Sequence, residues 1–153
     1  MSGSLISDLS TGYRQVEEVL SDRERAELAR ARDPSMRSRS QRGRSLLALV
    51  QLYRVGPRQL WAPVLLDLFA PAMLRRLQRL RAEPPVMVEE DIRQQLVLEL
   101  LHAVATMPLP SNPGHLKAAL LQRANQGVRR KLAREHSRQR SQRSYDAMVE
   151  ERS

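Results

Sequence analysis

The sequence predicts an all-α protein, and three features of the chain lead to that prediction. Apolar residues recur every three or four positions through most of the chain. No segment alternates apolar and polar residues with the period of two that a strand requires. Groups of Pro and Gly interrupt the apolar pattern at intervals that suit helix ends. With 153 residues and no Cys, the chain can form one small helical bundle around its own core without disulfides or a Cys-based zinc site.

The first 45 residues are predicted to stand apart from this bundle. Residues 1–32 form an N-terminal helical segment, whose helix starts near residue 13 and has only a thin apolar stripe. Ser21 and Glu24 have the spacing of a capping box, so the helix can equally restart directly after Ser21. Residues 33–45 are rich in Arg and Ser, contain a Pro and a Gly, and show no helical period. We therefore expect a flexible basic linker over 33–45, and the alternative for Arg37 to Arg44 is a phosphate-binding arm.

The bundle proper is predicted over residues 46–136. Its first helix is short, over residues 46–53, and is ended by Gly56-Pro57. Its second helix carries apolar residues at helical spacing over residues 61–80. Pro71 falls inside that pattern, where a proline is expected to kink or split a helix.

Two further helices complete the predicted bundle. Residues 89–107 begin with three acids, which complement the helix dipole, and are followed by a Pro-rich loop. The last helix is predicted over residues 115–135, and residues 137–153 are expected to form a fraying polar tail. Apolar residues at every fourth position of the last helix are expected to face the core: Leu116, Leu120, Ala124, Val128 and Leu132.

The positive charge of the chain is large and unevenly distributed. Lys and Arg number 26 against 17 Asp and Glu, which gives a formal net charge of +9 and a pI near 11.2. Residues 117–143 hold nine basic residues and one acid, a net charge of +8, whereas residues 70–107 hold five of each sign. The average composition fits either an Arg-rich surface or a polyanion-binding protein. Nearly the whole excess lies in the C-terminal third and in the stretch around Arg37 to Arg44, and such an uneven distribution favours a binding face.

Catalysis and membrane insertion find no support in the sequence. His102, His115 and His136 have no metal-ligand spacing, and no Gly-rich phosphate loop is present, so we predict no catalytic residue, no metal site and no cofactor. No stretch of about 18 apolar residues occurs, and the first residues lack the features of a secretory signal. We therefore expect a cytoplasmic protein that has no contact with a membrane.

The predicted last helix is the best candidate for nucleic-acid contact. With its apolar stripe facing the core, its cations are left on the outer surface, where they can follow a phosphate backbone. Such contacts recognise phosphate and not base sequence. The aromatic residues that usually stack on unpaired bases are missing between Phe69 and Tyr145. The predicted phosphate-binding residues are Arg123, Arg129, Arg130, Lys131 and Arg134.

Three stretches of the chain occur in an order that is familiar from one protein family. They are LFAPAMLRRL at 68–77, EDIRQQLVL at 90–98, and LKAALLQRAN at 116–125 with a basic run behind it. The first resembles a family helix in which an internal Pro is common, and the second is similar to a segment of the form Asp-Leu-x-Gln-Glu-x-Phe-Leu. The third looks like a helix that ends in Ala-x-Asn. Together, over residues roughly 64–135, they resemble the second conserved region of bacterial RNA polymerase sigma factors, most closely the extracytoplasmic-function type.

This resemblance implies a sigma-region-2-like bundle with two binding surfaces. Asp91, Gln94 and Gln95 would contact the clamp helices of the largest subunit of the RNA polymerase core. Asn125 and the Arg residues that follow it would lie beside promoter DNA, so the protein would be associated with the nucleoid. A second small DNA-binding protein would supply recognition of the upstream promoter element.

The chain also departs from the family pattern. Leu116, Ala119 and Leu120 occupy positions where the family has aromatic residues that open the duplex, and Arg129 replaces an acid. We therefore do not expect this chain to open the duplex alone. The alternative prediction is a helical adaptor or assembly protein that binds a protein partner and has non-specific affinity for nucleic acid through its basic last helix.

Overall fold

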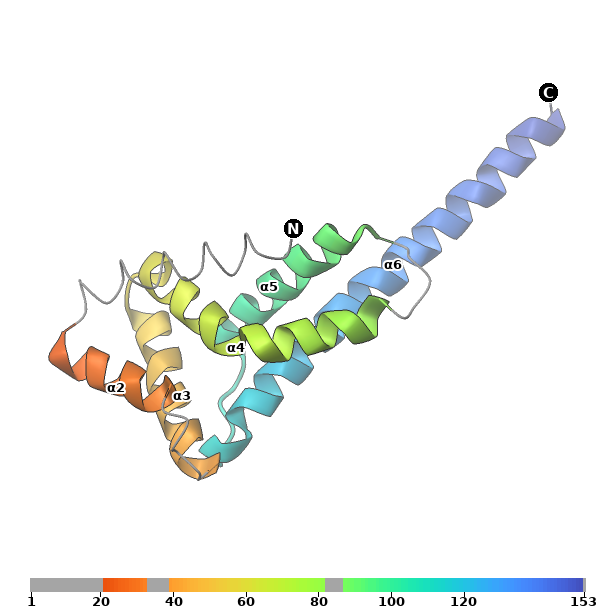
Figure 1. The fold of residues 1–153 in the computed structure, drawn as a ribbon. Helices are drawn as coiled ribbons and strands as arrows, with labels where there is room; N and C mark the ends of the chain where they lie inside the picture. The colour runs from red at the N-terminus through yellow and green to blue at the C-terminus, as the bar shows by residue number, and fades with distance from the viewer. Residues whose placement is uncertain (1–20, 33–38, 82–86, 153) are drawn as a thin grey trace.

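The structure, a computed structural model, describes residues 21–32, 39–81 and 87–152. This part of the chain contains α-helices, one short 3-10 helix and no strand, which confirms the predicted all-α bundle (Figure 1). The elements are α2 (Asp22–Arg32), α3 (Arg39–Val55), α4 (Arg58–Arg81), α5 (Glu89–Thr106), η1 (Pro113–His115) and α6 (Leu116–Arg152).

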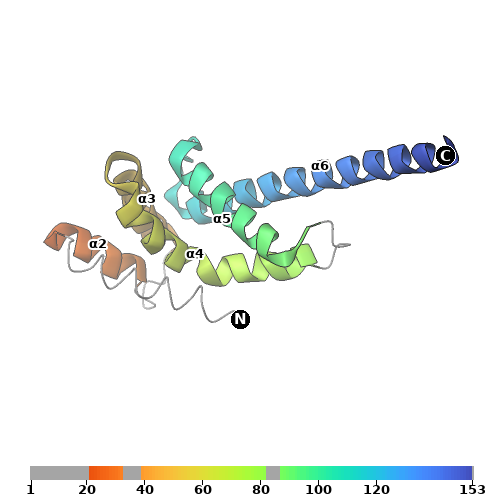
Figure 2. The ribbon, with the colours of Figure 1, turned by 90° about the horizontal axis from the view of Figure 1, so that it is seen from above.

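The core lies between α3, α4, α5 and the first half of α6. The α5 helix packs along α6, while α2 lies against α3 at the edge of the bundle (Figures 1 and 2). Trp61 and Phe69 are both buried, as expected for apolar residues on the inner stripe of α4. The five apolar residues predicted for the inner stripe of α6 are buried too. The largest fully buried aliphatic side chains are Leu49, Leu65, Leu80, Leu96, Leu100, Leu116 and Leu120.

The α2 helix starts where the capping box predicts. The Ser21 hydroxyl accepts a hydrogen bond of 3.4 Å from the backbone N–H of Glu24, and the helix begins at Asp22. The earlier part of the predicted helix, residues 13–20, lies outside the described residues. None of the described side chains of α2 belongs to the hydrophobic core.

The predicted linker over 33–45 is wrong for its second part, since residues 39–45 form the first turns of α3. Residues 33–38 lie outside the described residues. The buried face of these turns consists of Gly43 and Ser45, whose small side chains give no hydrophobic signal in the sequence. A Cβ atom at Gly43 would overlap the backbone carbonyl of Pro113, so only Gly lets α3 approach η1 this closely.

The α4 helix contains both of its prolines without interruption. Pro63 is the sixth residue of the helix, beyond its first turn, and Pro71 lies mid-helix on the exposed side, so each proline removes one intrahelical hydrogen bond. The ribbon changes direction along its length but remains one helix (Figure 1). The α4 helix therefore continues through Pro71, and the predicted split does not occur.

The C-terminal end of α5 is held by a side chain from α3. The Arg54 guanidinium donates hydrogen bonds of 2.8 Å to the Val104 carbonyl and 2.6 Å to the Met107 carbonyl. These carbonyls belong to the last turn of α5 and the residue after it, where no helical N–H is available for them. Arg54 thus joins the ends of α3 and α5.

The predicted fraying tail is also wrong, because α6 continues as helix to Arg152. No Gly or Pro follows Gly127, and side-chain pairs along the helix support it. Glu135 accepts from Arg138 at 3.0 Å and lies 3.8 Å from the Lys131 ammonium, and Gln142 donates to Asp146 at 3.0 Å. Residues 140–152 are all exposed, and this part of α6 projects away from the bundle (Figure 2).

Candidate nucleic-acid interface

The predicted phosphate-binding residues of α6 lie on its outer surface. Arg123, Arg129, Arg130 and Arg134 are exposed, while the inner stripe between them is buried. Lys131 is half-buried and lies near Glu135, so part of its charge is already compensated. Of the five predicted phosphate-binding residues, the four Arg residues are therefore the exposed cations.

Helix periodicity divides these residues into two rows. Arg123, Arg130 and Arg134 are spaced seven and four residues apart, which places them on one side of α6. Asn125 and Arg129 are four residues apart and lie in line with Ala118 on a different side. Asn125 is half-buried. We call Arg123, Arg130 and Arg134 the α6 ridge.

The predicted polymerase-binding residues lie together near the start of α5. Asp91 and Gln94 are exposed, and Gln95 is half-buried with its amide donating a 3.0 Å hydrogen bond to Glu99. Leu98, at four residues from Gln94, is 61% exposed. An exposed Leu beside exposed polar groups on one helix face gives a small amphipathic surface, which we call the α5 face.

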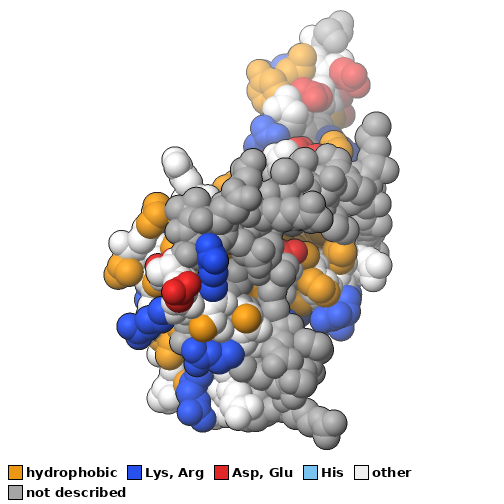
Figure 3. Space-filling model, turned by 60° about the vertical axis from the view of Figure 1, so that its left-hand side comes forward, with side chains coloured by type: hydrophobic (Ala, Val, Ile, Leu, Met, Phe, Trp, Pro, Cys, Tyr) orange, Lys and Arg blue, Asp and Glu red, His pale blue; other side chains and the backbone are white. Residues whose placement is uncertain are grey.

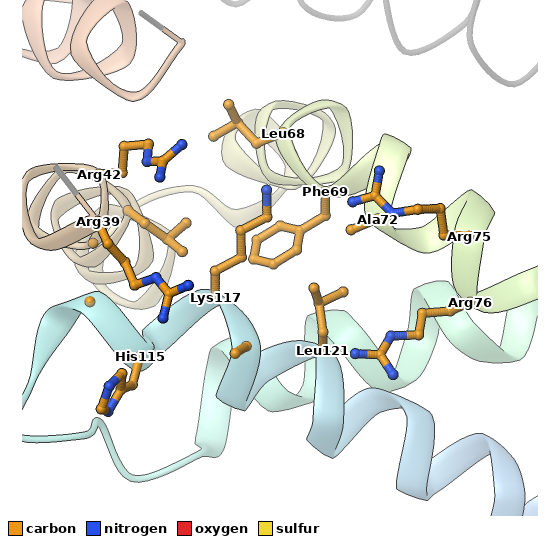
Figure 4. A pocket seen from close by; sticks show the side chains of 14 residues that line it. Arg39, Arg42, Leu68, Phe69, Ala72, Arg75, Arg76, His115, Lys117 and Leu121 are labelled. Atoms are coloured by element: carbon orange, nitrogen blue, oxygen red, sulfur yellow. The ribbon is translucent and has the colours of Figure 1, made fainter. Parts of the chain in front are cut away.

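A second basic site, which the sequence did not predict, lies between α3, α4 and the start of α6. It is a groove of about 490 Å³, and we call it the basic groove. Arg39 and Arg42 reach it from α3, Arg75 and Arg76 from α4, and Lys117 from α6 (Figure 4). Lys and Arg side chains are also prominent on the face turned forward in Figure 3, which shows the α2 and α3 side of the molecule.

Lys117 occupies the middle of the basic groove. Its ammonium nitrogen lies 5.9 Å from the centre of the Phe69 ring, within reach of a cation–π attraction. Partial burial of the ammonium lowers the pKa of Lys117, and the positive charges of Arg75 and then Arg42 lower it further. The groove therefore concentrates positive charge, and none of the described residues that line it is acidic.

No sequence motif marks the basic groove, because its residues are far apart along the chain. Arg42, Arg75 and Lys117 are separated by more than thirty residues each, and only the packing of three helices brings them together. The sequence contains a basic cluster near Arg42, but a flexible linker would give its residues no defined position. Predicting the groove would require predicting that α3 starts at Arg39, and the small buried residues Gly43 and Ser45 give no apolar pattern that indicates this.

The described residues contain no group of three or more His, Cys, Asp or Glu side chains that could hold a metal ion. None of the described helices is long and apolar enough to cross a membrane. Comparison of the chain with protein-family models, curated proteins and solved structures finds no match. The sigma-like interpretation therefore depends on the residue pattern, and it stays a prediction.

Proposed function

We propose that this protein is a sigma-region-2-like transcription protein, which binds DNA through α6 and the RNA polymerase core through the α5 face. The observation that carries the proposal is the exposure of the Arg residues of α6 along a helix whose apolar stripe is buried. A solvated surface helix ordinarily mixes its charges. From residue 117 to 143 this helix has a single acid, Glu135, which already lies beside Lys131 and Arg138.

The α6 ridge predicts a DNA affinity that depends steeply on salt. Each phosphate neutralised by a cation releases counterions, which contributes a slope of about −0.9 to a plot of log affinity against log salt. Replacing Arg130 and Arg134 with Gln should therefore make this slope shallower by about 1.8, together with a loss of affinity at low salt. Duplex DNA titrated across a salt series, with fluorescence anisotropy as the readout, measures both quantities.

The matched control for that experiment is the replacement of Arg23 and Arg25 with Gln. Both residues are exposed on α2, so the net charge of the protein changes by the same amount away from the ridge. The control variant should keep the wild-type slope. Equal slopes for the two double variants would show that only overall charge matters, and the assignment of the ridge would then be wrong.

The α5 face predicts a contact with the polymerase that is largely independent of DNA. Replacement of Asp91, Gln94 and Gln95 with Ala should abolish co-purification of polymerase subunits with the tagged full chain. The control variant replaces Gln59 and Gln78, which are exposed on α4, and it should retain the polymerase. Retention of polymerase by the triple variant would contradict the assignment of this face.

The second candidate function is a helical adaptor for a protein partner, and the end of α6 favours it. Tyr145, Met148 and Val149 are 64%, 56% and 49% exposed on a segment that projects from the bundle. Apolar side chains on a projecting helix suit contact with another protein. An adaptor that binds through such apolar contacts should lose little affinity as salt increases, whereas the proposed DNA complex should dissociate.

A further inference from the structure

The basic groove has the composition of an anion site. Its lining includes four Arg, one Lys and His115, and none of the described residues that line it is acidic. Like charges in one groove repel one another, so the arrangement costs free energy in the absence of a counter-charge. A bound anion would remove this cost.

The position of Lys117 shows where the negative charge of a ligand would be placed. Arg42 from α3 and Arg75 from α4 lie on either side of this ammonium, so cations from three helices line one groove (Figure 4). A perturbed lysine in a cleft, flanked by further cations, is a common feature of functional sites. The first turn of α6 adds the positive end of a long helix dipole to the same region.

The remaining walls of the groove are apolar. Leu46, Leu68, Phe69, Ala72 and Leu121 line it beside the cations. The volume of about 490 Å³ lies within the range of small-molecule sites, which is about 300–1,000 Å³. A ligand that combines a compact charged group with an uncharged body therefore fits both kinds of wall.

The number of cations favours phosphate over carboxylate. A carboxylate carries one negative charge and is satisfied by a single Arg in a fork-to-fork pair. A terminal phosphate carries about −1.5 to −2 charges and accepts hydrogen bonds on three oxygens, which suits several donors that converge from different directions. Arg42, Arg75 and Lys117 line the groove from three different helices and can supply such donors.

We propose that the basic groove between α3, α4 and α6 binds the phosphate group of a nucleotide, with the uncharged part of that nucleotide against the apolar wall. The phosphate lies among Arg42, Arg75 and Lys117. This site is separate from the α6 ridge, and it does not depend on the proposed binding of polymerase or promoter DNA. A free nucleotide offers a terminal phosphate with up to two negative charges, whereas one nucleotide of a single strand offers a phosphodiester with one, so the terminal phosphate fits the number of cations better.

The test is isothermal titration of the full chain with AMP and, as the ligand without phosphate, adenosine. AMP should bind at least about tenfold more tightly than adenosine, since a charge-assisted hydrogen bond contributes at least that factor. Replacement of Lys117 with Gln should weaken AMP binding by about tenfold or more, and replacement of Arg75 with Gln should do the same. Equal affinity for AMP and adenosine, or no binding of AMP, would overturn the proposal.

Arg79→Gln is the matched control for Arg75→Gln. Arg79 is exposed one turn further along α4 and does not line the groove, so its removal should leave AMP affinity within twofold of the wild type. An equal loss in both variants would show a general charge effect and would overturn the proposal. Lys117 and Arg75 are exposed, so both variants should fold, and thermal melting verifies this.

Two competitors test which ligand the groove accepts: an oligonucleotide tests the source of the phosphate, and an acidic peptide tests the selectivity for phosphate. A short single-stranded oligonucleotide without terminal phosphates should displace AMP if the groove accepts a phosphodiester of a strand. If the oligonucleotide does not displace AMP, the groove binds a free nucleotide. Displacement and its absence are both consistent with a phosphate site in the groove. A short acidic peptide that displaces AMP equally well would overturn the assignment to phosphate. Because AMP does not require the α6 ridge, failure of the proposed DNA binding would leave this result unaffected.

Discussion

Replacing Gly43 with Ala tests how closely α3 approaches the segment before α6. In the interior of an exposed helix this change ordinarily stabilises a protein by about 1 kcal/mol. Here the new Cβ would overlap the carbonyl of Pro113 and would lie 2.7 Å from the amide nitrogen of Gly114. Backbone atoms cannot rotate away as a side chain does, so α3 and η1 must separate. Overpacking of this kind costs up to about 3 kcal/mol, which leaves a net loss of about 2 kcal/mol.

For a chain of this size, 2 kcal/mol corresponds to a decrease in Tm of roughly 4–8 °C, measured by far-UV circular dichroism. Gly127→Ala is the control, because that Cβ would meet the Glu99 side chain and mainly its carboxylate end. The Glu99 side chain can adopt another rotamer, which breaks its hydrogen bond from Gln95. The free energy of unfolding of Gly127→Ala should therefore stay within about 1 kcal/mol of the wild type. A Gly43→Ala variant that melts at or above the wild-type temperature would refute the close approach of α3 and η1.

Three further predictions concern the bundle and the groove. Arg54→Met should lower the free energy of unfolding by about 2 kcal/mol in urea titrations, because two carbonyls at the end of α5 lose a charged donor; an unchanged urea midpoint would show that water replaces the donor. Leu100→Ala should cost about 3 kcal/mol through a cavity in the core, while Leu98→Ala on the exposed side of the same helix should change stability by less than about 0.5 kcal/mol. Burial and two neighbouring Arg residues lower the pKa of Lys117 below its ordinary value of 10.5, so the unfolded chain binds more protons than the folded chain just below that pH. The contribution of Lys117 to stability should therefore increase as pH rises through this window, and Lys117→Gln should lack the increase; parallel pH profiles of Tm for the two proteins would contradict this.

The helices that were predicted correctly are those in which large apolar residues mark the buried face. In α5 and in the first half of α6, Leu recurs at positions such as Leu96, Leu100, Leu116 and Leu120, and burial follows that pattern. The exposed Arg residues of α6 could be predicted for the same reason, since they occupy the other positions of a helix whose inner stripe is clear.

The errors have physical causes in particular residues. The start of α3 resembles a linker in the sequence because Gly43 and Ser45 fill its buried positions, and close backbone packing leaves no apolar signal. The end of α6 resembles a frayed tail in the sequence because its helix is supported by side-chain pairs such as Gln142 with Asp146, and not by a stripe that packs against the core. The basic groove required the relative placement of three helices, which no local pattern contains.

The long α6 helix lies in two environments, and this has a consequence for local unfolding. Amide protons from Leu116 to Leu132 are protected by the packed bundle and should exchange with solvent only when the bundle opens. Amide protons beyond residue 140 belong to exposed turns and should exchange by fraying from the end of the helix, at a much lower free energy. The distal turns of α6 can therefore unfold and refold without opening the core. Substitutions beyond residue 140 can then change the contacts of this segment without lowering the free energy of unfolding of the bundle.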